Sequence, residues 1–386
     1  MQVYLDNSAT TSAHPRVVEA VVDALTNNYG NPSSMHSMGI QAEKLLKNSR
    51  RFVAKALGGS EKEVFFTSGG TESNNLAIFG TAQAYRKTGN HIITTEVEHP
   101  SVLNACKQLE TEGFEVTYIK PNQLGYVSKE DVLATIRPDT ILLSIMHVNN
   151  ETGAIQPVAE IAKALKKLKK KPVFHVDGVQ AIGKLRVSVK RLGVDLYSIS
   201  GHKIHGPKGT GALFIKDGSK ITPRQVGGAQ EKSIRPGTEN VPGLCGLGVA
   251  AELVQVDLNA DIEKLQHLRN AFWRKIESEL TDLKMNSGFG DDFGPHILNI
   301  SFVGMRGEVL LHALESKGIY VSTGSACASK NKSYSHVLTA MGMTEPEMEG
   351  AIRFSFNAEQ NVKEVECAAE VVCESVRALS KIIKGR

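Results

Sequence analysis

The sequence predicts an α/β protein in which a mostly parallel, seven-stranded sheet forms a large domain and a smaller α+β domain follows it. Short β-rich runs alternate with amphipathic helical patterns over the first two-thirds of the 386 residues. This alternation is typical of parallel sheets covered by helices on both faces. The composition then changes near Leu258, and no apolar run reaches the length of a membrane span.

The strands of the large domain are expected where short runs are rich in apolar and β-branched residues. They are Val64–Thr67, His91–Thr95, Val116–Ile119, Thr140–His147, Pro172–Val176, Leu196–Ile199 and Ala212–Ile215. The clearest helix between them is Pro157–Lys170, where apolar residues recur at helical spacing after a proline suited to a first turn. We expect the lysines at 166, 167 and 169–171 to close this helix, where cations suit the negative end of the dipole, rather than to bind nucleic acid.

The smaller domain is expected to begin with a long, charged amphipathic helix over Asn259–Leu283, which carries the sole tryptophan, Trp273. Further elements are predicted at His296–Phe302, Glu308–Ser316, Ile319–Val321, Ala351–Phe356 and Asn361–Lys384. The sequence therefore predicts a large domain over residues 15–258 and a small domain over residues 259–386, together with residues 1–14.

Composition and charge exclude several classes of protein. Hydrophobic residues make up 41% and charged residues 22% of the chain, values close to the globular averages, which exclude a disordered, collagenous or coiled-coil protein. The net charge of +4 is too small to indicate direct binding to nucleic acid or to an anionic membrane. The N-terminus lacks the charged and apolar regions of a signal peptide, so we expect a soluble, cytoplasmic protein.

The cysteines do not form a disulfide framework, because five are scattered over a long chain. We expect four of them to be packing residues, namely Cys106, Cys245, Cys367 and Cys373. His175, His202 and His205 lack a cysteine or carboxylate cluster at ligand spacing, so no metal site is expected.

Three motifs together indicate a cofactor. Thr67–Asn75 places Gly69 and Gly70 between a strand and a helix, where free N–H groups and the positive dipole end can bind a phosphate; a Gly-Gly turn of this kind is also common without a ligand. Asp177 ends an apolar strand and could meet a ligand or cap a helix. Lys203 follows the next strand. An aldehyde cofactor needs a phosphate anchor, an acid beside its pyridine nitrogen and a lysine, so the three together point to pyridoxal phosphate.

With these three motifs, the sequence resembles the cysteine desulfurases of the NifS/IscS type, within the class-V, fold-type I pyridoxal-phosphate enzymes. Besides the three motifs above, the matching stretches run nearly from end to end: Tyr4–Thr11, Gly30–Ser34, Glu98–Pro100, Val148–Gly153, Arg235–Asn240, Thr323–Cys327 and Ile352–Ser355. The Gly-Ser-Ala-Cys stretch that ends at Cys327, with a long polar segment after it, resembles the group I members.

The resemblance implies how the cofactor is held. Lys203 would bind it covalently, and Asp177 would keep its pyridine nitrogen protonated. Gln180 would hydrogen-bond the ring phenolate oxygen, while His99 would stack on the ring and move protons. Five residues would hold the phosphate, and one of them, Thr238, would come from a second subunit. They are Gly70, Thr71, Ser200, His202 and Thr238.

The resemblance also implies the reaction. The substrate would be L-cysteine, oriented through its carboxylate by Arg353 and by Asn150, which would also contact the cofactor. Cys327, on a mobile loop, would take the sulfur as a persulfide, and L-alanine would leave. The sulfur acceptor would be an Fe–S scaffold protein or a tRNA-thiolating enzyme, and the protein would be a homodimer. An aminotransferase and a selenocysteine lyase are the alternatives on this fold, and a catalytically silent scaffold for sulfur-handling proteins is the alternative from another class.

Overall fold

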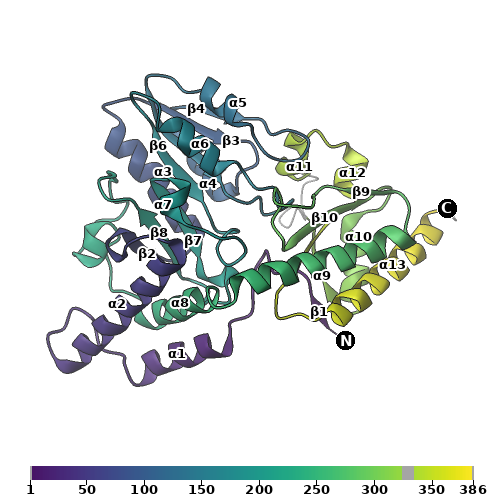
Figure 1. The fold of residues 1–386 in the computed structure, drawn as a ribbon, viewed down its shortest axis with the longest axis horizontal. Coiled ribbons are helices and arrows are strands. Elements are labelled where there is room, and N and C mark those ends of the chain that lie inside the picture. Colours follow the sequence, from purple (N-terminus) through teal and green to yellow (C-terminus); the bar gives the residue numbers. More distant parts are fainter. Residues whose placement is uncertain (1, 324–333, 385–386) are drawn as a thin grey trace.

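The computed structural model of the chain describes residues 2–323 and 334–384. Two bodies of secondary structure lie side by side, one built on a seven-stranded sheet and the other on a four-stranded sheet. The long helix α9 (Leu258–Glu279) begins beside the first body and runs along the second (Figure 1). The N-terminal strand β1 (Val3–Tyr4) and the C-terminal helix α13 (Val362–Lys384) both belong to the second body.

The first sheet confirms the predicted strands with shifts of one residue at some ends. Its order is β2-β8-β7-β6-β5-β3-β4, and its strands are β2 (Val64–Thr67), β3 (His91–Thr95), β4 (Glu115–Ile119), β5 (Thr140–Met146), β6 (Val173–Asp177), β7 (Leu196–Ser200) and β8 (Gly211–Ile215). The pairs from β7 to β4 are parallel, and β8 is antiparallel to both of its neighbours. The mostly parallel sheet of the prediction is therefore confirmed.

Helices cover both faces of this sheet, as predicted. They are α1 (Pro15–Thr26), α2 (Ser37–Leu57), α3 (Gly70–Tyr85), α4 (Pro100–Thr111), α5 (Lys129–Ala134), α6 (Val158–Leu165), α7 (Val189–Leu192) and α8 (Val241–Leu253). Leu142 and Leu143, adjacent on β5, belong to two different core clusters. Successive side chains of a strand point to opposite faces, so each cluster packs one layer of helices on one face.

The predicted helix Pro157–Lys170 is too long, because α6 ends at Leu165. Lys170 Nζ donates hydrogen bonds to the backbone oxygens of Thr88 and Pro138, and Lys171 Nζ pairs with Asp195 at 2.8 Å. These partners lie just before β3, β5 and β7. Lys166 is the C-cap of α6, as expected of a lysine that closes the helix, whereas Lys170 and Lys171 leave the helical path to bind neighbouring segments, which the local pattern did not reveal.

The second body has a sheet of order β12-β13-β10-β9 with antiparallel pairs. Its elements are α9, β9 (Leu283–Met285), β10 (Ile297–Phe302), α10 (Gly307–Glu315), β11 (Ile319–Tyr320), β12 (Ser322–Thr323), α11 (His336–Ala340), α12 (Glu345–Glu349), β13 (Ala351–Ser355) and α13. The predicted helix Asn259–Leu283 is wrong at its end, because the backbone of Leu280 is extended and leads into β9. The division into two domains stays a prediction, supported by the separate core of each body.

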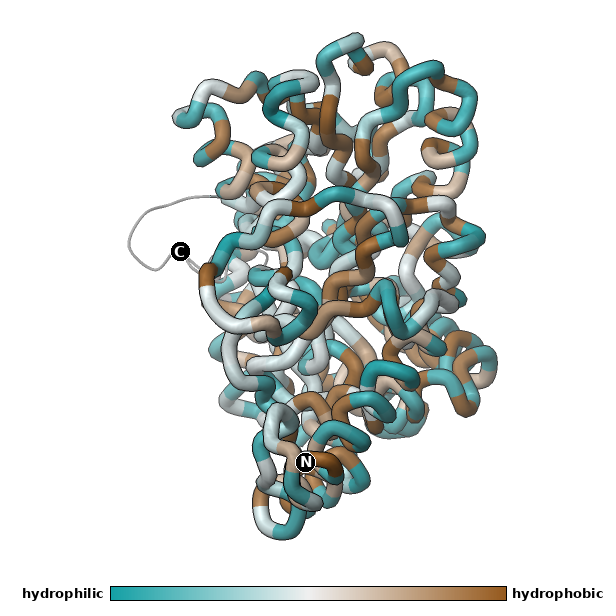
Figure 2. Tube along the Cα trace, turned by 90° about the vertical axis from the view of Figure 1, so that its left-hand side faces the viewer, coloured by the Kyte–Doolittle hydropathy of each residue, from teal (hydrophilic) through white to brown (hydrophobic). Residues whose placement is uncertain are grey.

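Hydrophobic residues recur along the helices between hydrophilic ones, which is the pattern of helices that bury one face (Figure 2).

Three of the four expected packing cysteines are buried, whereas Cys367 is half-buried. Over the described part of the chain, no single helix is long and apolar enough to cross a membrane, and only the bent pair α8 and α9 passes that test together. No group of three or more His, Cys, Asp or Glu side chains could hold a metal ion within residues 2–323 and 334–384.

Candidate active site

A cavity of about 810 Å³ collects most of the predicted site residues. Its walls come from the carboxyl ends of β5, β6 and β7, from the first turns of α3 and α4, and from the second body. Ten of the predicted residues line it: Gly70, Thr71, His99, Asn150, Asp177, Gln180, Ser200, His202, Lys203 and Arg353. Residues far apart in sequence therefore meet where the strands of a parallel sheet end, which is the usual place for a ligand.

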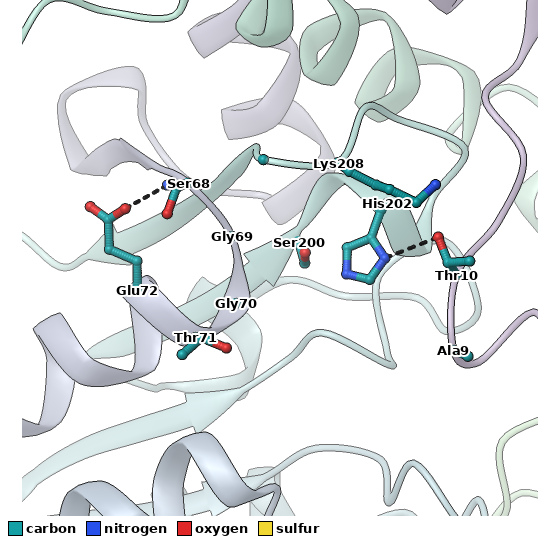
Figure 3. Close-up of a pocket in the computed structure, with 11 residues that line it drawn as sticks. Ala9, Thr10, Ser68, Gly69, Gly70, Thr71, Glu72, Ser200, His202 and Lys208 are labelled. Carbon is teal, nitrogen blue, oxygen red and sulfur yellow. Dashed lines mark hydrogen bonds between the residues drawn. The ribbon is translucent and has the colours of Figure 1, made fainter. Parts of the chain in front are cut away.

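The turn from β2 into α3 forms a cradle for an anion (Figure 3). Gly69 is the N-cap of α3 with a φ of 153°, and within the described residues no side chain forms a cap hydrogen bond there. A Cβ on Gly70 would lie 2.8 Å from Val179 Cγ2, so a larger residue does not fit. The unbonded N–H groups and the positive end of the α3 dipole therefore face a hollow of about 460 Å³.

Polar side chains surround this hollow on the side opposite α3. Ser200 ends β7, and His202 lies in the next turn, with Nδ1 3.2 Å from Thr10 Oγ1. Lys208 adds a positive charge to the lining, and its side chain lies near His202 in Figure 3. Burial is the main cause that lowers the pKa of His202 to about 4, so its ring is neutral at pH 7. The cradle thus combines backbone donors, a hydroxyl and a cation, which suits a phosphate group.

Lys203 ends a short 3₁₀ turn, Gly201–Lys203, directly after β7. Its Nζ donates hydrogen bonds to the backbone oxygens of Ser8 and Ala9, the latter at 2.7 Å. Burial lowers the pKa of Lys203 to about 8, helped by the nearby charge of Arg353. About a tenth of this amine is therefore unprotonated at pH 7 and can act as a nucleophile or a base.

Asp177 is fixed at the end of β6 by two donors. Asn74 Nδ2 donates to its Oδ2 at 2.7 Å, and the backbone N–H of Val179 donates to its Oδ1 at 3.0 Å. Asn74 also donates to Ser101 Oγ at 2.9 Å. Asn74 was not predicted as a site residue, although it stands one helical turn after Gly70, within the Thr67–Asn75 motif.

His99 caps the start of α4 with its ring. Its Nδ1 accepts from the backbone N–H of Ser101 at 3.1 Å, so in the neutral ring the proton lies on Nε2. Burial lowers the pKa of His99, opposed by the charge of Asp177. The ring is thus held neutral on the cavity wall, with Nε2 able to exchange protons.

Arg353 projects from β13 of the second body and is 7% exposed. Its Nη1 donates to the backbone oxygen of Asn150 at 2.8 Å, and its Nη2 donates to Asp6 Oδ1 at 2.7 Å. Asp6, which the sequence analysis did not assign, lies within the Tyr4–Thr11 stretch. Its carboxylate fixes the guanidinium beside the cavity.

Gln180 also lines the cavity, and Glu98 is a buried neighbour of the lining residue His99. Gln180 Nε2 donates to the backbone oxygen of Ser8 at 2.9 Å, which orients its amide at the cavity. Glu98 is fully buried next to His99, where Thr95 Oγ1 and the N–H of Met146 donate to its Oε1. Burial raises the pKa of Glu98 to about 8, so this carboxyl is mostly neutral at pH 7. Glu98 was not predicted as a site residue, although it belongs to the matching stretch Glu98–Pro100.

Two predicted residues are not placed in this cavity. Thr238 is exposed on the surface of the first body, between the turn Gln230–Ser233 and α8, and it does not line the cavity of its own chain. Cys327, with the loop on which it was expected, lies outside the described residues. The residues on either side of that gap, Thr323 and Tyr334, both line the cavity.

Comparisons with known proteins agree with this geometry. The family model described as aminotransferase class-V matches residues 3–367. The cysteine desulfurase IscS of Clostridium botulinum (strain Hall) is 44% identical over 388 residues, which covers 100% of this chain and 95% of that protein. A cysteine desulfurase IscS of Methanosarcina thermophila is 46% identical over 378 residues, with 98% and 92% covered.

Solved structures show the same likeness. A NifS-like protein superposes with a TM-score of 0.91 at 38% identity, covering 97% of this chain and 99% of that chain. DndA from Streptomyces lividans gives a TM-score of 0.77 at 38% identity, with 92% and 99% covered. A structure described as SspA in complex with cysteine gives 0.81 at 34% identity, with 94% and 100% covered.

Proposed function

Because this chain belongs to the aminotransferase class-V family and, within it, to the cysteine desulfurases, we propose that its cavity binds pyridoxal 5′-phosphate and L-cysteine and passes the sulfur to Cys327. The family match covers residues 3–367, and the relatives align over nearly the whole chain. The observation that carries the proposal is that the α3 cradle, Asp177 and Lys203 line one cavity.

The residues present fit this cofactor. The cradle of Gly70, Thr71, Ser200 and His202 suits its phosphate, and the buried Asp177 carboxylate suits a protonated ring nitrogen. Ser8 Oγ and Asn74 Oδ1 are buried and have no partner among the described residues, and both residues line the cavity. When bound, the cofactor supplies an electron sink for charge that develops at the substrate α-carbon.

Lys203 and His99 handle the protons. The Lys203 amine, with a pKa near 8, can take a proton from the substrate α-carbon and return it later. His99 holds a proton on Nε2 at the same cavity. Its Nδ1 is occupied by the Ser101 N–H, so only Nε2 can exchange with the substrate.

Arg353 and Asn150 would orient the substrate carboxylate, since a guanidinium fork matches a carboxylate with two parallel bonds. Cys327 as a thiolate would attack the sulfur of the substrate. A sulfur–sulfur bond forms as the carbon–sulfur bond breaks, the carbon keeps the electron pair and is protonated, and L-alanine leaves. The activated thiolate is required because an unperturbed cysteine is mostly protonated at pH 7.

The test follows the sulfur and the alanine together. Wild-type protein with bound cofactor should form one Cys327 persulfide for each alanine released, as measured by mass spectrometry and amino-acid analysis. Cys327→Ser should bind cysteine but form almost no alanine. Release of a keto acid instead of alanine would favour an aminotransferase, and a strong preference for selenocysteine would favour a selenocysteine lyase. If wild type forms no alanine from cysteine, the proposed function is wrong and a silent scaffold is favoured.

We also propose that the protein is a homodimer in which Thr238 completes the phosphate site of the other subunit. The exposure of Thr238 outside its own cavity supports this, because a two-fold arrangement builds both sites from the same two surfaces. Lys203→Ala and Thr238→Ala subunits, mixed, should regain activity that neither has alone. A fully active monomer would contradict the proposal.

The acceptor of the sulfur is proposed to be a protein, either an Fe–S scaffold or a tRNA-thiolating enzyme. Several relatives are cysteine desulfurases named IscS, which supports a sulfur-donor role. Transfer from the Cys327 persulfide to each candidate acceptor, compared with release to dithiothreitol, would distinguish between them.

A further inference from the structure

A chain of hydrogen bonds joins Asp177 to His99. Asn74 Nδ2 donates to Asp177 Oδ2 at 2.7 Å and to Ser101 Oγ at 2.9 Å. Ser101 Oγ in turn lies 2.8 Å from His99 Nδ1. Asp177 ends β6 and Asn74 lies on α3, whereas the other two residues stand at the start of α4. Three elements that are far apart in sequence therefore meet in one chain of well-formed bonds.

Three members of this chain are buried, and the fourth is exposed. Asn74 is 1% exposed, Asp177 6% and Ser101 9%, so the low local dielectric strengthens the bonds between them. His99, by contrast, is exposed and lines the cavity. The chain therefore connects a buried carboxylate to a side chain that a ligand can reach.

The direction of the first two bonds follows from the chemistry of the groups. A carboxylate only accepts hydrogen bonds, so the amide nitrogen of Asn74, rather than its oxygen, faces Asp177. The opposite orientation would place Asn74 Oδ1 against a carboxylate oxygen. The second hydrogen of the same Nδ2 points to Ser101, whose side-chain oxygen therefore accepts.

The direction of the last bond follows from the first two. Because Ser101 Oγ accepts from Asn74, its own hydrogen is free to point at His99 Nδ1. The backbone N–H of Ser101 donates to the same nitrogen at 3.1 Å, so Nδ1 faces two donors and carries no proton. A hydroxyl that Asn74 did not hold could turn and accept from a protonated Nδ1. The Asn74 amide thus decides which form of the His99 ring the hydroxyl favours.

We propose that Asn74 and Ser101 are positioning residues that join Asp177 to His99 and keep the His99 proton on Nε2. The inference deepens the proposed function, on which it rests for the roles of Asp177 and His99. Hydrogen bonds made to the neutral form of a group disfavour its charged form, so the Ser101 hydroxyl keeps the ring from becoming a cation. The neutral ring then offers its Nε2–H to a ligand in the cavity.

Other groups also act on the His99 ring. Partial burial is the main cause that lowers its pKa; the charge of Asp177 opposes this, and the charges of Lys203 and His336 add to it. Glu98, the preceding residue, is mostly neutral at pH 7 because burial raises its pKa to about 8. Removal of the serine hydroxyl changes none of these charges, so it isolates the contribution of the hydroxyl.

The test measures the His99 ring in protein without cofactor, by NMR of isotope-labelled histidine, which reports both the tautomer and the pKa. In wild type, the proton of the neutral ring should lie on Nε2. Ser101→Ala removes the hydroxyl but keeps the backbone N–H, so the pKa of His99 should rise by about 0.4–1.1 pH units, the equivalent of one lost hydrogen bond. Ser101→Thr keeps a hydroxyl and should leave this pKa near that of wild type, and His99→Gln identifies the signals of the ring.

Asn75→Ala is the matched control for Asn74→Ala. Asn75 is the next residue of α3, and its Nδ2 donates to the backbone oxygen of Ser101 at 3.2 Å, outside the chain. Asn74→Ala frees the Ser101 hydroxyl to accept from a protonated ring, so the pKa of His99 should rise at least as much as in Ser101→Ala. Asn75→Ala should leave it unchanged. Because Asn74 acts through the hydroxyl, Asn74→Ala should have a smaller effect on this pKa in the Ser101→Ala background than in wild type.

The enzyme loaded with cofactor supplies a second measurement. A higher pKa keeps His99 a cation up to a higher pH, so in Ser101→Ala the loss of alanine formation toward acid should begin at a higher pH than in wild type. The rate at pH 6 relative to the rate at pH 8 should therefore fall by up to about 10-fold, whereas cofactor content should stay the same. Asn75→Ala should leave this ratio unchanged.

Three results would overturn the proposal. Ser101→Ala could leave the pKa of His99 unchanged, Asn75→Ala could raise it as much as Asn74→Ala, or the wild-type ring could carry its proton on Nδ1. The Ser101 variants decide the question even where Asn74→Ala does not fold. Failure of the proposed function is a separate result, because loaded wild type would then form no alanine, whatever the NMR of the cofactor-free protein shows.

Discussion

The two walls of the cavity are built by different means. The wall of the first body takes Gly70, Asp177 and Lys203 from the ends of strands in one continuous sheet, each a few residues from a buried strand. The wall of the second body takes Arg353 and Ser335, which are held by side-chain bonds to residues 347 and 184 positions away. Both walls use side-chain bonds between distant residues. The groups of the first wall follow strands of one sheet, whereas the second wall joins the N-terminal stretch, β13 and the start of α11. Cofactor binding and sulfur transfer should accordingly respond to different substitutions.

The largest effect is expected on the first wall, from Lys203→Ala. Without this amine the cofactor is not bound covalently and the α-carbon proton has no base, so turnover should fall by at least about 100-fold. The yellow colour of the wild-type protein should be absent from this variant. In the wild-type protein, borohydride should bleach the colour and leave the cofactor permanently attached to Lys203. Lys190→Ala, at an exposed lysine of α7, is the control and should stay yellow and active. A colourless wild-type protein that gains no absorption band with added pyridoxal phosphate would contradict the assignment of the first wall as the cofactor-binding wall.

Gly70→Ala should show how rigid the first wall is. The added Cβ would lie 2.8 Å from Val179 Cγ2, and overpacking of this kind costs about 1–3 kcal/mol. If that strain moves the first turn of α3, the affinity for pyridoxal phosphate should fall by about 5- to 150-fold. Val179→Ala in the same chain opens the space and should restore most of the affinity, while Val179→Ala alone should change it little. Failure of this rescue would show that the cradle does not depend on the approach of Val179.

Asp6→Ala tests the second wall. It removes the carboxylate partner of Arg353 Nη2, a charged hydrogen bond whose loss should lower the free energy of unfolding by about 1.5–3 kcal/mol. The KM for cysteine should rise because the guanidinium is no longer held, whereas cofactor affinity should change little. Asp6→Asn keeps an acceptor and should lose less. Chemical denaturation measures the change in stability, and steady-state kinetics measures the change in KM. If cofactor affinity fell by as large a factor as the KM for cysteine rises, the two walls would not differ in what they bind.

The smallest effect concerns pH and couples the two walls. The unprotonated Lys203 amine reacts with the cofactor, so the rate at which the cofactor-free protein takes up pyridoxal phosphate should rise with pH and level off above the pKa of about 8. The rise between pH 7 and pH 8 should be about fivefold. Arg353→Gln removes a positive charge that lowers this pKa, so the midpoint should move to higher pH. A wild-type rate still rising steeply above pH 9 would show that burial does not lower the pKa.

The same contrast explains how far the sequence could predict this molecule. All seven strands of the first sheet were predicted, because six of them are buried along their whole length and are nearly continuous apolar runs. The motifs at the strand ends are local as well. β1, two residues long, carries no such signal. Asp6 was missed as the partner of Arg353, and Glu151 as the partner of Ser335, because each bond joins residues too far apart in sequence for a local pattern to reveal. Asn74 could have been found, since a helical turn after Gly70 points toward the same cavity.

The pairing of β1 with β11 has a consequence for how the protein is made. Val3 pairs with Ile319, and the residues just after β1, including Asp6 and Ser8, line the cavity. On a ribosome that adds about 5–20 residues per second, β1 waits about 15–60 s for its partner strand. The first sheet, complete by Ile215, can form during that interval, whereas the cavity cannot close until the second body has been synthesised. Nascent chains halted before β11 should therefore resist proteolysis over the first sheet but lack the Arg353 side of the cavity, and so fail to bind L-cysteine.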